Sequence, residues 1–172
     1  MSKIFFACSN DIKTISGFAN DENSPVESAK DVEYYYSENG YITVKLKAGK
    51  LNSFEYPEEY TELKDGVYLE FFDSTGNITS ALTSNYAKRF ERKKIMEAMH
   101  DVEIIDFIED KKLNTEHLIW DENSRKIYNE SFVKITTPDK IIYGDGFETD
   151  ENFSEYIIKK TRGEILVDRK EK

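Results

Sequence analysis

The stretch from Leu118 to Ile157 decides the fold, because one pattern occurs in it twice. The first copy reads Leu118, Trp120, Asp121-Glu122-Asn123 and Ile127-Tyr128, and the second reads Phe147, Thr149, Asp150-Glu151-Asn152 and Tyr156-Ile157. In each copy an apolar residue precedes an Asp-Glu-Asn turn and an apolar pair follows it, which is typical of a strand, a tight turn and another strand. Such a unit buries its apolar face against its neighbours, so the pattern predicts repeating β structure.

Alternation of apolar and polar residues extends this β pattern along the chain. It occurs at Ile42, Val44 and Leu46, at Val67, Leu69 and Phe71, and at Val133 and Ile135. Turn signals lie between or beside these runs, at Asn39-Gly40, Asp65-Gly66, Asp73-Ser74-Thr75-Gly76, Pro138-Asp139-Lys140 and Gly144-Asp145-Gly146. Turns at this spacing predict an all-β sandwich, roll or barrel.

Residues 86–99 are rich in Ala, Lys, Glu, Arg and Met, and helix propensity alone favours a helix there. The alternative is two strands: Leu82, Ser84 and Tyr86 alternate in one, a turn spans residues 89–94, and Met96, Ala98, His100 and Val102 alternate in the next. We predict strands, in keeping with the rest of the chain.

Length and charge limit the classes of protein. The 172 residues suffice for one domain with a real core, and a formal net charge of −10 makes the surface repel phosphate backbones and anionic lipid headgroups. Nucleic acid is therefore excluded as a partner. We expect a polar tether over residues 1–30, a packed domain over residues 31–167 and a charged tail over residues 168–172.

Cys8 is the one cysteine, and it follows a short apolar run, Ile4-Phe5-Phe6-Ala7. A small residue before the cysteine and a polar stretch after it are the form of a bacterial lipoprotein cleavage site. The apolar run is too short for a signal sequence or a membrane helix, so Cys8 is either a lipid-attachment site behind a longer leader or an ordinary free thiol.

Catalytic and metal-binding patterns are weak. Asp121, Glu122, Asp150 and Glu151 invite a glycosidase hypothesis, but they lie in turns, where Asp and Asn are favoured for backbone reasons. The two histidines, His100 and His117, have no matching cysteine or histidine cluster. We therefore expect no catalytic residues, no metal, no cofactor and no enzymatic activity.

Large apolar residues at alternating strand positions are the remaining candidates. Each is by default a core residue. Taken together they can line an apolar interior that is open at its ends and suits an acyl chain. The candidate lipid-binding residues are Leu69, Phe71, Leu82, Tyr86, Trp120, Val133, Ile135 and Phe147.

A family resemblance rests on several segments in a fixed order. They are residues 31–40 (DVEYYYSENG), 66–73 (GVYLEFFD), 84–87 (SNYA), 113–118 (LNTEHL), 120–121 (WD), 126–128 (KIY), 142–147 (IYGDGF) and 163–165 (GEI). Together they make the chain, from about residue 31 to residue 165, resemble the LptC family, the periplasmic, membrane-anchored component of the lipopolysaccharide export ABC transporter. The Tyr-Tyr-Ser-Glu-Asn-Gly stretch at residues 35–40 is similar to the Bacteroidetes branch.

The resemblance implies a β-jellyroll of the OstA/LptA-like kind, with two facing antiparallel sheets and an open hydrophobic groove for the acyl chains of lipopolysaccharide. It implies a carrier without catalysis, in the periplasm at the inner membrane of a Gram-negative bacterium. Its partners would be lipopolysaccharide, the transporter subunits and the next jellyroll of the periplasmic bridge. The family's transmembrane helix has no counterpart in the short run before Cys8.

The carboxy-terminal strand is the candidate partner edge. It carries Tyr156, Ile157, Ile158, Gly163 and Ile165 and has no proline to block pairing with another chain. By resemblance this edge would join the bridge protein, and residues 31–36 would join the transporter. Two rival hypotheses remain at this point: a carbohydrate- or protein-binding β-sandwich of the cell envelope, and the acidic glycosidase.

Overall fold

The computed structural model describes residues 24–150 and 156–165, and within them the chain forms strands and no helix. The strands are β1 (Glu27–Glu38), β2 (Tyr41–Phe54), β3 (Tyr60–Phe72), β4 (Ile78–Ser84), β5 (Tyr86–Phe90), β6 (Ile95–Asp106), β7 (Lys111–Asp121), β8 (Lys126–Thr136), β9 (Lys140–Asp150), β10 (Tyr156–Ile158) and β11 (Arg162–Ile165). The all-β prediction is confirmed.

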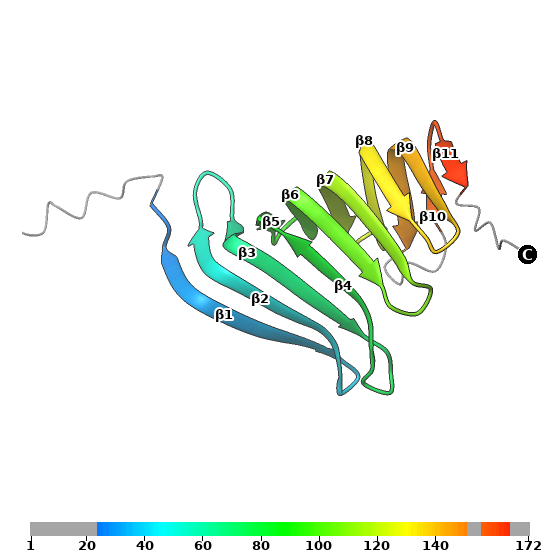
Figure 1. The fold of residues 1–172 in the computed structure, drawn as a ribbon. Helices are drawn as coiled ribbons and strands as arrows, with labels where there is room; N and C mark the ends of the chain where they lie inside the picture. Colours follow the sequence, from blue (N-terminus) through cyan, green and yellow to red (C-terminus); the bar gives the residue numbers. More distant parts are fainter. Residues whose placement is uncertain (1–23, 151–155, 166–172) are drawn as a thin grey trace, which may run out of the picture.

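All eleven strands belong to one antiparallel sheet with the order β1-β2-β3-β4-β6-β7-β8-β9-β10. Two strands lie off this path: β5 pairs with β3 and β6, and β11 pairs with β9. The chain therefore runs as a meander, and β1 and β11 lie at opposite ends of the molecule (Figure 1). A meander needs only short turns, which agrees with the turn signals in the sequence.

The long strands bend at a common level, which we call the crease. Ladder pairing is interrupted there between Ala48 and Lys50 of β2, Met99 and Val102 of β6, Thr115 and Ile119 of β7, and Asn129 and Phe132 of β8. In β3 the bend falls on Asp65 and Gly66, both with positive φ. Bulges of this kind add residues to one strand and sharpen its bend.

Neighbouring bends lie side by side. The backbone N–H of Asn85, which separates β4 from β5, donates to the carbonyl of His100 in β6 at 2.9 Å. On β2, a Cβ added to Gly49 would lie 2.6 Å from the carbonyl oxygen of Asp65 on β3, so only glycine permits this approach. The crease thus runs across the sheet from strand to strand.

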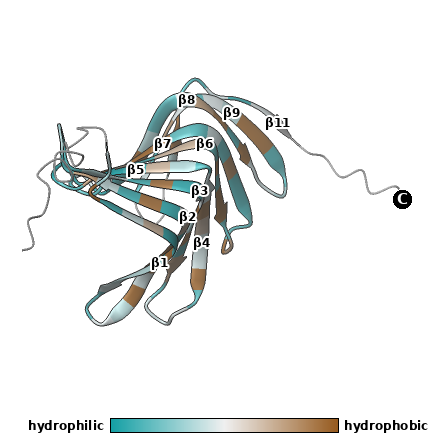
Figure 2. Cartoon of the chain, turned by 90° about the vertical axis from the view of Figure 1, so that its left-hand side faces the viewer, coloured by the Kyte–Doolittle hydropathy of each residue, from teal (hydrophilic) through white to brown (hydrophobic). Residues whose placement is uncertain are grey.

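The crease divides the sheet into two arms. Arm A consists of residues 33–38, 42–48, 67–72, β4, 102–106, 111–115, 133–136, 141–143 and β11. Arm B consists of residues 27–30, 50–54, 60–64, β5, 95–99, 117–121, 126–129, 147–150 and β10. The predicted two facing antiparallel sheets are therefore two arms of one folded sheet. The view from the β1 side shows how strongly this sheet curves (Figure 2).

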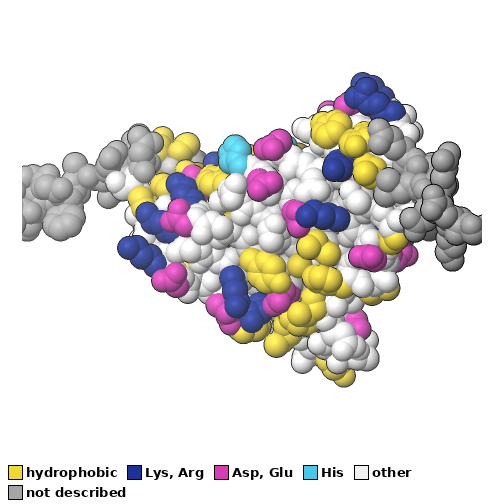
Figure 3. Space-filling model, viewed as in Figure 1, with side chains coloured by type: hydrophobic (Ala, Val, Ile, Leu, Met, Phe, Trp, Pro, Cys, Tyr) yellow, Lys and Arg dark blue, Asp and Glu magenta, His cyan; other side chains and the backbone are white. Residues whose placement is uncertain are grey.

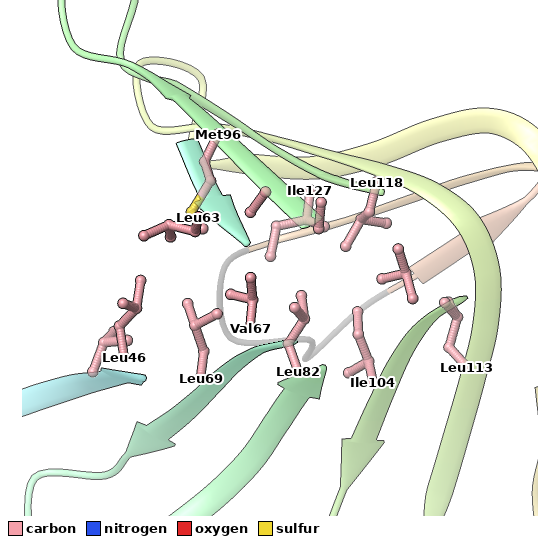
Figure 4. Packing of buried hydrophobic residues seen from close by; sticks show 14 of the residues in the cluster. Leu46, Leu63, Val67, Leu69, Leu82, Met96, Ile104, Leu113, Leu118 and Ile127 are labelled. Atoms are coloured by element: carbon pink, nitrogen blue, oxygen red, sulfur yellow. The ribbon is translucent and has the colours of Figure 1, made fainter. Parts of the chain in front are cut away.

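The core lies between the arms. In Figure 4 the side chains of Leu46, Val67, Leu69, Leu82, Ile104 and Leu113 rise from arm A toward those of Leu63, Met96, Leu118 and Ile127 of arm B. All ten are at most 6% exposed. Burial of a side chain of this size stabilises the fold by about 1.5–3 kcal/mol relative to exposure, so this aliphatic layer accounts for much of the stability.

The structure confirms some details of the sequence prediction and corrects others. Residues 86–90 form β5, residues 91–94 a turn and residues 95–99 the start of β6. The prediction of strands is confirmed and the helix alternative is wrong, but the turn is shorter than predicted, because Arg89 and Phe90 belong to β5. Asp65-Gly66 and Gly144-Asp145-Gly146 are not turns between strands, because they lie inside β3 and β9 at the crease. The first strand begins at Glu27, within the predicted tether, whereas Cys8 and the charged tail lie outside the described residues.

Candidate functional site

The space between the arms is the candidate site, and most predicted residues line it. Leu69, Leu82, Val133, Ile135 and Phe147 are buried on the inner face. Phe71 and Trp120 are partly buried and pack against the same core. The structure therefore brings together seven of the eight candidate residues on the inner face of one sheet.

Tyr86 does not belong to this group. Its hydroxyl donates to Glu62 at 2.9 Å, and the Lys64 ammonium lies 5.9 Å from its ring centroid. Glu62 and Lys64 flank Leu63, which is 4% exposed on the inner face, so they and Tyr86 lie on the outer face of arm B. The prediction for Tyr86 is wrong because the bend at Asn85 shifts the alternation by one residue between Ser84 and Tyr86.

An aromatic contact crosses the interior near its middle. The rings of Phe71, on arm A, and Trp120, on arm B, have centroids 6.4 Å apart and an interplanar angle of 64°. This edge-to-face arrangement is worth about 0.5–1.5 kcal/mol beyond the area it buries. Two aromatic candidate side chains therefore meet across the space that the arms enclose.

One end of the interior, which we call the wide end, lies beneath β1. Its cavity has a volume of about 210 Å³. The apolar part of its lining comes from Leu46, Leu51, Leu63 and Met96, and the polar part from Glu27, Tyr34, Tyr36, Ser53, Thr61, Arg89 and Glu91. Tyr34 and Tyr36 are 43% and 44% exposed, so they stand at an opening of the cavity to solvent.

Arg89 is the charged residue that marks the wide end. Its Nε donates to Glu91 at 3.0 Å and its Nη1 donates to Glu122 at 2.6 Å. Partial burial acts to lower the pKa of Arg89, but these two carboxylates raise it overall. Desolvation raises the pKa of nearby Tyr36. The wide end thus combines an apolar floor with a rim of paired charges.

The opposite end, which we call the narrow end, lies near β10. Its cavity has a volume of about 40 Å³ and an apolar lining of Ile104, Leu113, Ile135, Phe147 and Tyr156, with Asp106, Lys111, Lys112 and Thr149 beside them. The Lys111 ammonium, on arm A, lies 4.9 Å from the Tyr156 ring centroid on arm B. This cation–π contact closes the narrow end across the two arms.

The sheet ends in a free strand on each side, as far as the described residues show. β1 is the terminal strand on one side, and β10 and β11 are the terminal strands on the other. The predicted carboxy-terminal edge is therefore two short strands, with Tyr156, Ile157 and Ile158 in β10 and Gly163 and Ile165 in β11. Ile157 is 62% exposed, whereas Tyr156 and Ile158 pack against the core.

The carboxylates of the repeated turns have structural partners where the structure describes them. Asp121 accepts hydrogen bonds from the backbone N–H of Asn123 and the hydroxyl of Ser124, both at 2.9 Å, and the Ser124 hydroxyl lowers its pKa. Glu122 pairs with Arg89. Asp150 ends β9, and Glu151 lies outside the described residues. Asp121 and Glu122 thus serve a turn and an ion pair.

The histidines lie near the crease on the outer side. His117 Nε2 is 3.2 Å from a Glu97 carboxylate oxygen, and the His100 ring lies against Tyr86 with centroids 6.5 Å apart. Within the part of the chain that the structure describes, no cluster of three metal-ligating side chains occurs.

The surface seen in Figure 3 carries charges of both signs, with hydrophobic side chains gathered on the lower part of this face.

Sequence reasoning missed Arg89 and Asn129 as inward-facing residues. Arg89 alternates with Ala87, which is fully buried, but the predicted turn over residues 89–94 concealed this signal. Asn129 alternates with Ile127 in the same way and is 1% exposed. A polar residue at an inward strand position is the pattern that identifies both.

An antiparallel sheet folded around an apolar interior, with a terminal strand at each end, defines a β-jellyroll-like fold. The family model described as LptC, lipopolysaccharide-assembly, LptC-related, matches residues 10–162, and the chain belongs to this family. It is therefore a component of lipopolysaccharide transport, of a kind that acts in the periplasm in association with the inner membrane. No curated protein matches the chain. Within the described residues, no helix has the length and hydrophobicity needed to cross a membrane.

Proposed function

We propose that the space between the arms binds the acyl chains of lipopolysaccharide and passes the lipid from the inner-membrane ABC transporter to the periplasmic bridge. One observation carries this proposal: a continuous cluster of mainly apolar side chains lines the inner faces of both arms from the wide end to the narrow end. Each methylene removed from water contributes about 0.8 kcal/mol, so several chains can be held without any contact to the headgroup.

The arms separate when the lipid enters. The two cavities, of about 210 and 40 Å³, are smaller than the roughly 300–1,000 Å³ that ligand pockets occupy. The contacts that join the arms at the middle and at the narrow end, Phe71 with Trp120 and Lys111 with Tyr156, are each worth about 0.5–1.5 kcal/mol. Burial of a few methylenes offsets their loss.

The headgroup stays outside. The net charge of −10 repels its phosphates. The cavity of the wide end is lined by Glu27, Glu91 and Arg89, and Arg89 also pairs with Glu122, so negative charge outweighs positive charge there. Affinity therefore comes from acyl burial, which suits a carrier that must release its lipid.

Native mass spectrometry of the full chain, purified from its own envelope in a mild detergent, tests the proposed function. We expect lipopolysaccharide to copurify, and we expect Leu82→Asp to lose it, because a carboxylate in a dry groove is costly. Lys134→Asp on the outer face is the matched control. A wild-type protein without lipid would favour the carbohydrate- or protein-binding alternative.

The partner edges belong to the same proposal. Lys159 exchanges both backbone hydrogen bonds with β9, its N–H donating to Gly146 at 2.9 Å and its carbonyl accepting from Asp145 at 3.1 Å. Hydrogen-bonded and non-hydrogen-bonded pairs alternate along antiparallel strands, so the N–H and C=O of Ile158 point away from β9 toward the free edge. These groups are available to a strand of the bridge protein, and β1 offers the equivalent edge to the transporter.

Ile158→Pro tests the carboxy-terminal edge because it removes an edge N–H without removing a bond to β9. We expect affinity for the bridge jellyroll to fall at least about tenfold in a binding assay, with an unchanged circular dichroism spectrum. Ile158→Ala, which also loses the side chain but keeps the N–H, is the matched control. Equal loss in both variants would show that the side chain and not the edge is responsible.

Anchoring completes the proposal. We infer that Cys8 carries a lipid when a longer leader precedes it, and that the residues between it and β1 form the tether to the inner membrane. Metabolic labelling with an alkyne fatty acid should mark the wild type and not Cys8→Ser. Equal labelling would exclude this site.

A further inference from the structure

Asn129 is a buried polar residue on the inner face. It is 1% exposed and is one of the four largest fully buried side chains, with Ile127, Val102 and Val133. It lies on β8 beside the crease, two positions from Ile127 on the inner face. An amide among aliphatic side chains requires an explanation, because buried polar atoms nearly always have partners.

The amide nitrogen of Asn129 has hydrogen-bond partners at the crease. Its Nδ2 donates to Thr115 Oγ1 at 2.8 Å and to the carbonyl oxygen of His117 at 3.0 Å. Ladder pairing between β7 and β8 is interrupted at this level, so the amide nitrogen replaces missing backbone bonds. The His117 carbonyl can only accept, which fixes the nitrogen on this side and the oxygen on the other.

The amide oxygen of Asn129 has no such partner. Asn129 Oδ1 is buried and accepts no hydrogen bond from any described residue. The hydrogen bonds that stabilise the crease involve only the amide nitrogen, so the oxygen is not needed for them. A carboxamide oxygen without a donor in an apolar environment is costly, so a donor from outside the chain is expected to reach it.

The register of Asn129 in the sheet indicates what that donor is attached to. Asn129 pairs in register with Phe147 of β9, and Phe147 lines the cavity of the narrow end. On the proposed function, an acyl chain that runs between the arms passes this point with its apolar surface against Ile127 and Val133. A hydroxyl carried on such a chain has both the apolar body and the O–H donor that this place requires.

We propose that Asn129 Oδ1 accepts a hydrogen bond from the hydroxyl of a hydroxylated acyl chain, and that it makes the interior select such chains over unsubstituted ones. This inference rests on the proposed function, and it adds a specificity-determining residue to it. The hydroxyl donates to Oδ1 while the amide nitrogen keeps its two bonds at the crease.

The experiment compares the Kd of 3-hydroxytetradecanoic acid with that of tetradecanoic acid, for the full chain and for Asn129→Leu, which has nearly the same shape and no acceptor. For each protein, the Kd of tetradecanoic acid is divided by the Kd of 3-hydroxytetradecanoic acid. This ratio should be about five times larger in the wild type than in the variant, which corresponds to about 1 kcal/mol. Tetradecanoic acid should bind both proteins equally or bind the variant more tightly.

A ligand-side control keeps the test decisive if Asn129→Leu fails to fold. In the wild type, 3-methoxytetradecanoic acid keeps the oxygen but has no proton to donate, so it should lose the advantage of the hydroxylated acid. Equal preference for the hydroxylated acid in wild type and variant, or equal binding of the hydroxyl and methoxy compounds, would overturn the inference alone. Failure of every acid to bind would overturn the proposed function and the inference with it.

Discussion

The two ends of the interior differ although one folded sheet builds both. The wide end has a cavity of about 210 Å³, a rim that includes Arg89 and Glu91, and half-exposed Tyr34 and Tyr36 at its opening. The narrow end has a cavity of about 40 Å³ lined by Phe147, Tyr156 and other apolar side chains. The wide end therefore has more open space, and the narrow end is packed more tightly.

This difference between the ends indicates which of them stabilises the fold and which gives access to the interior. Close packing contributes to stability in proportion to the surface it buries, whereas a half-exposed rim contributes little. We therefore expect the arms to part more readily at the wide end than at the narrow end. On the proposed function, lipid enters beneath β1 and its acyl chains extend toward β10.

The largest expected effect is at the narrow end. Phe147→Ala should lower the free energy of unfolding by about 3–5 kcal/mol, because Phe147 is 3% exposed and its removal leaves a cavity. Tyr36→Ala at the wide end should lower it by less than about 1 kcal/mol, because Tyr36 is 44% exposed. Urea titration measures both. Similar losses in the two variants would remove the distinction between the ends.

A smaller effect is expected from the ion pairs of the wide end. Arg89→Met should lower the free energy of unfolding by about 1–2 kcal/mol, less than the 3–5 kcal/mol of a fully buried pair, because the Arg89 and Glu122 side chains are 22% and 25% exposed. Arg92→Met, at the more exposed pair with Glu59, is the matched control, with a loss below about 0.5 kcal/mol. Adding Glu122→Gln to Arg89→Met should recover part of the loss, and an additive double variant would argue against the pairing.

The comparison of the ends also shows what the sequence could predict. Alternation places Leu69, Ile135 and Phe147 on the inner face, since a strand has a period of two wherever it is regular. The crease interrupts that period. For this reason alternation assigned Tyr86 to the wrong face, and the bend at Asp65-Gly66 was predicted as a turn between strands. Cavity sizes and the pairing of Arg89 with Glu122 depend on residues that are far apart in the chain. No local pattern contains that information.

Photo-crosslinking to purified lipopolysaccharide tests the central claim, that the interior of the folded sheet holds the acyl chains. A photoreactive residue would replace Phe71, Trp120, Ile135 and Phe147 in turn on the inner face, and Tyr86, Lys45 and Lys134 on the outer face, with circular dichroism to confirm each fold. Tyr86 is the most informative control, because alternation alone assigns it to the interior and the structure assigns it to the outside. We predict strong crosslinks at the four inner positions and background levels at the three outer ones. Crosslinking at Tyr86, Lys45 and Lys134 as strong as at the inner positions would contradict the claim.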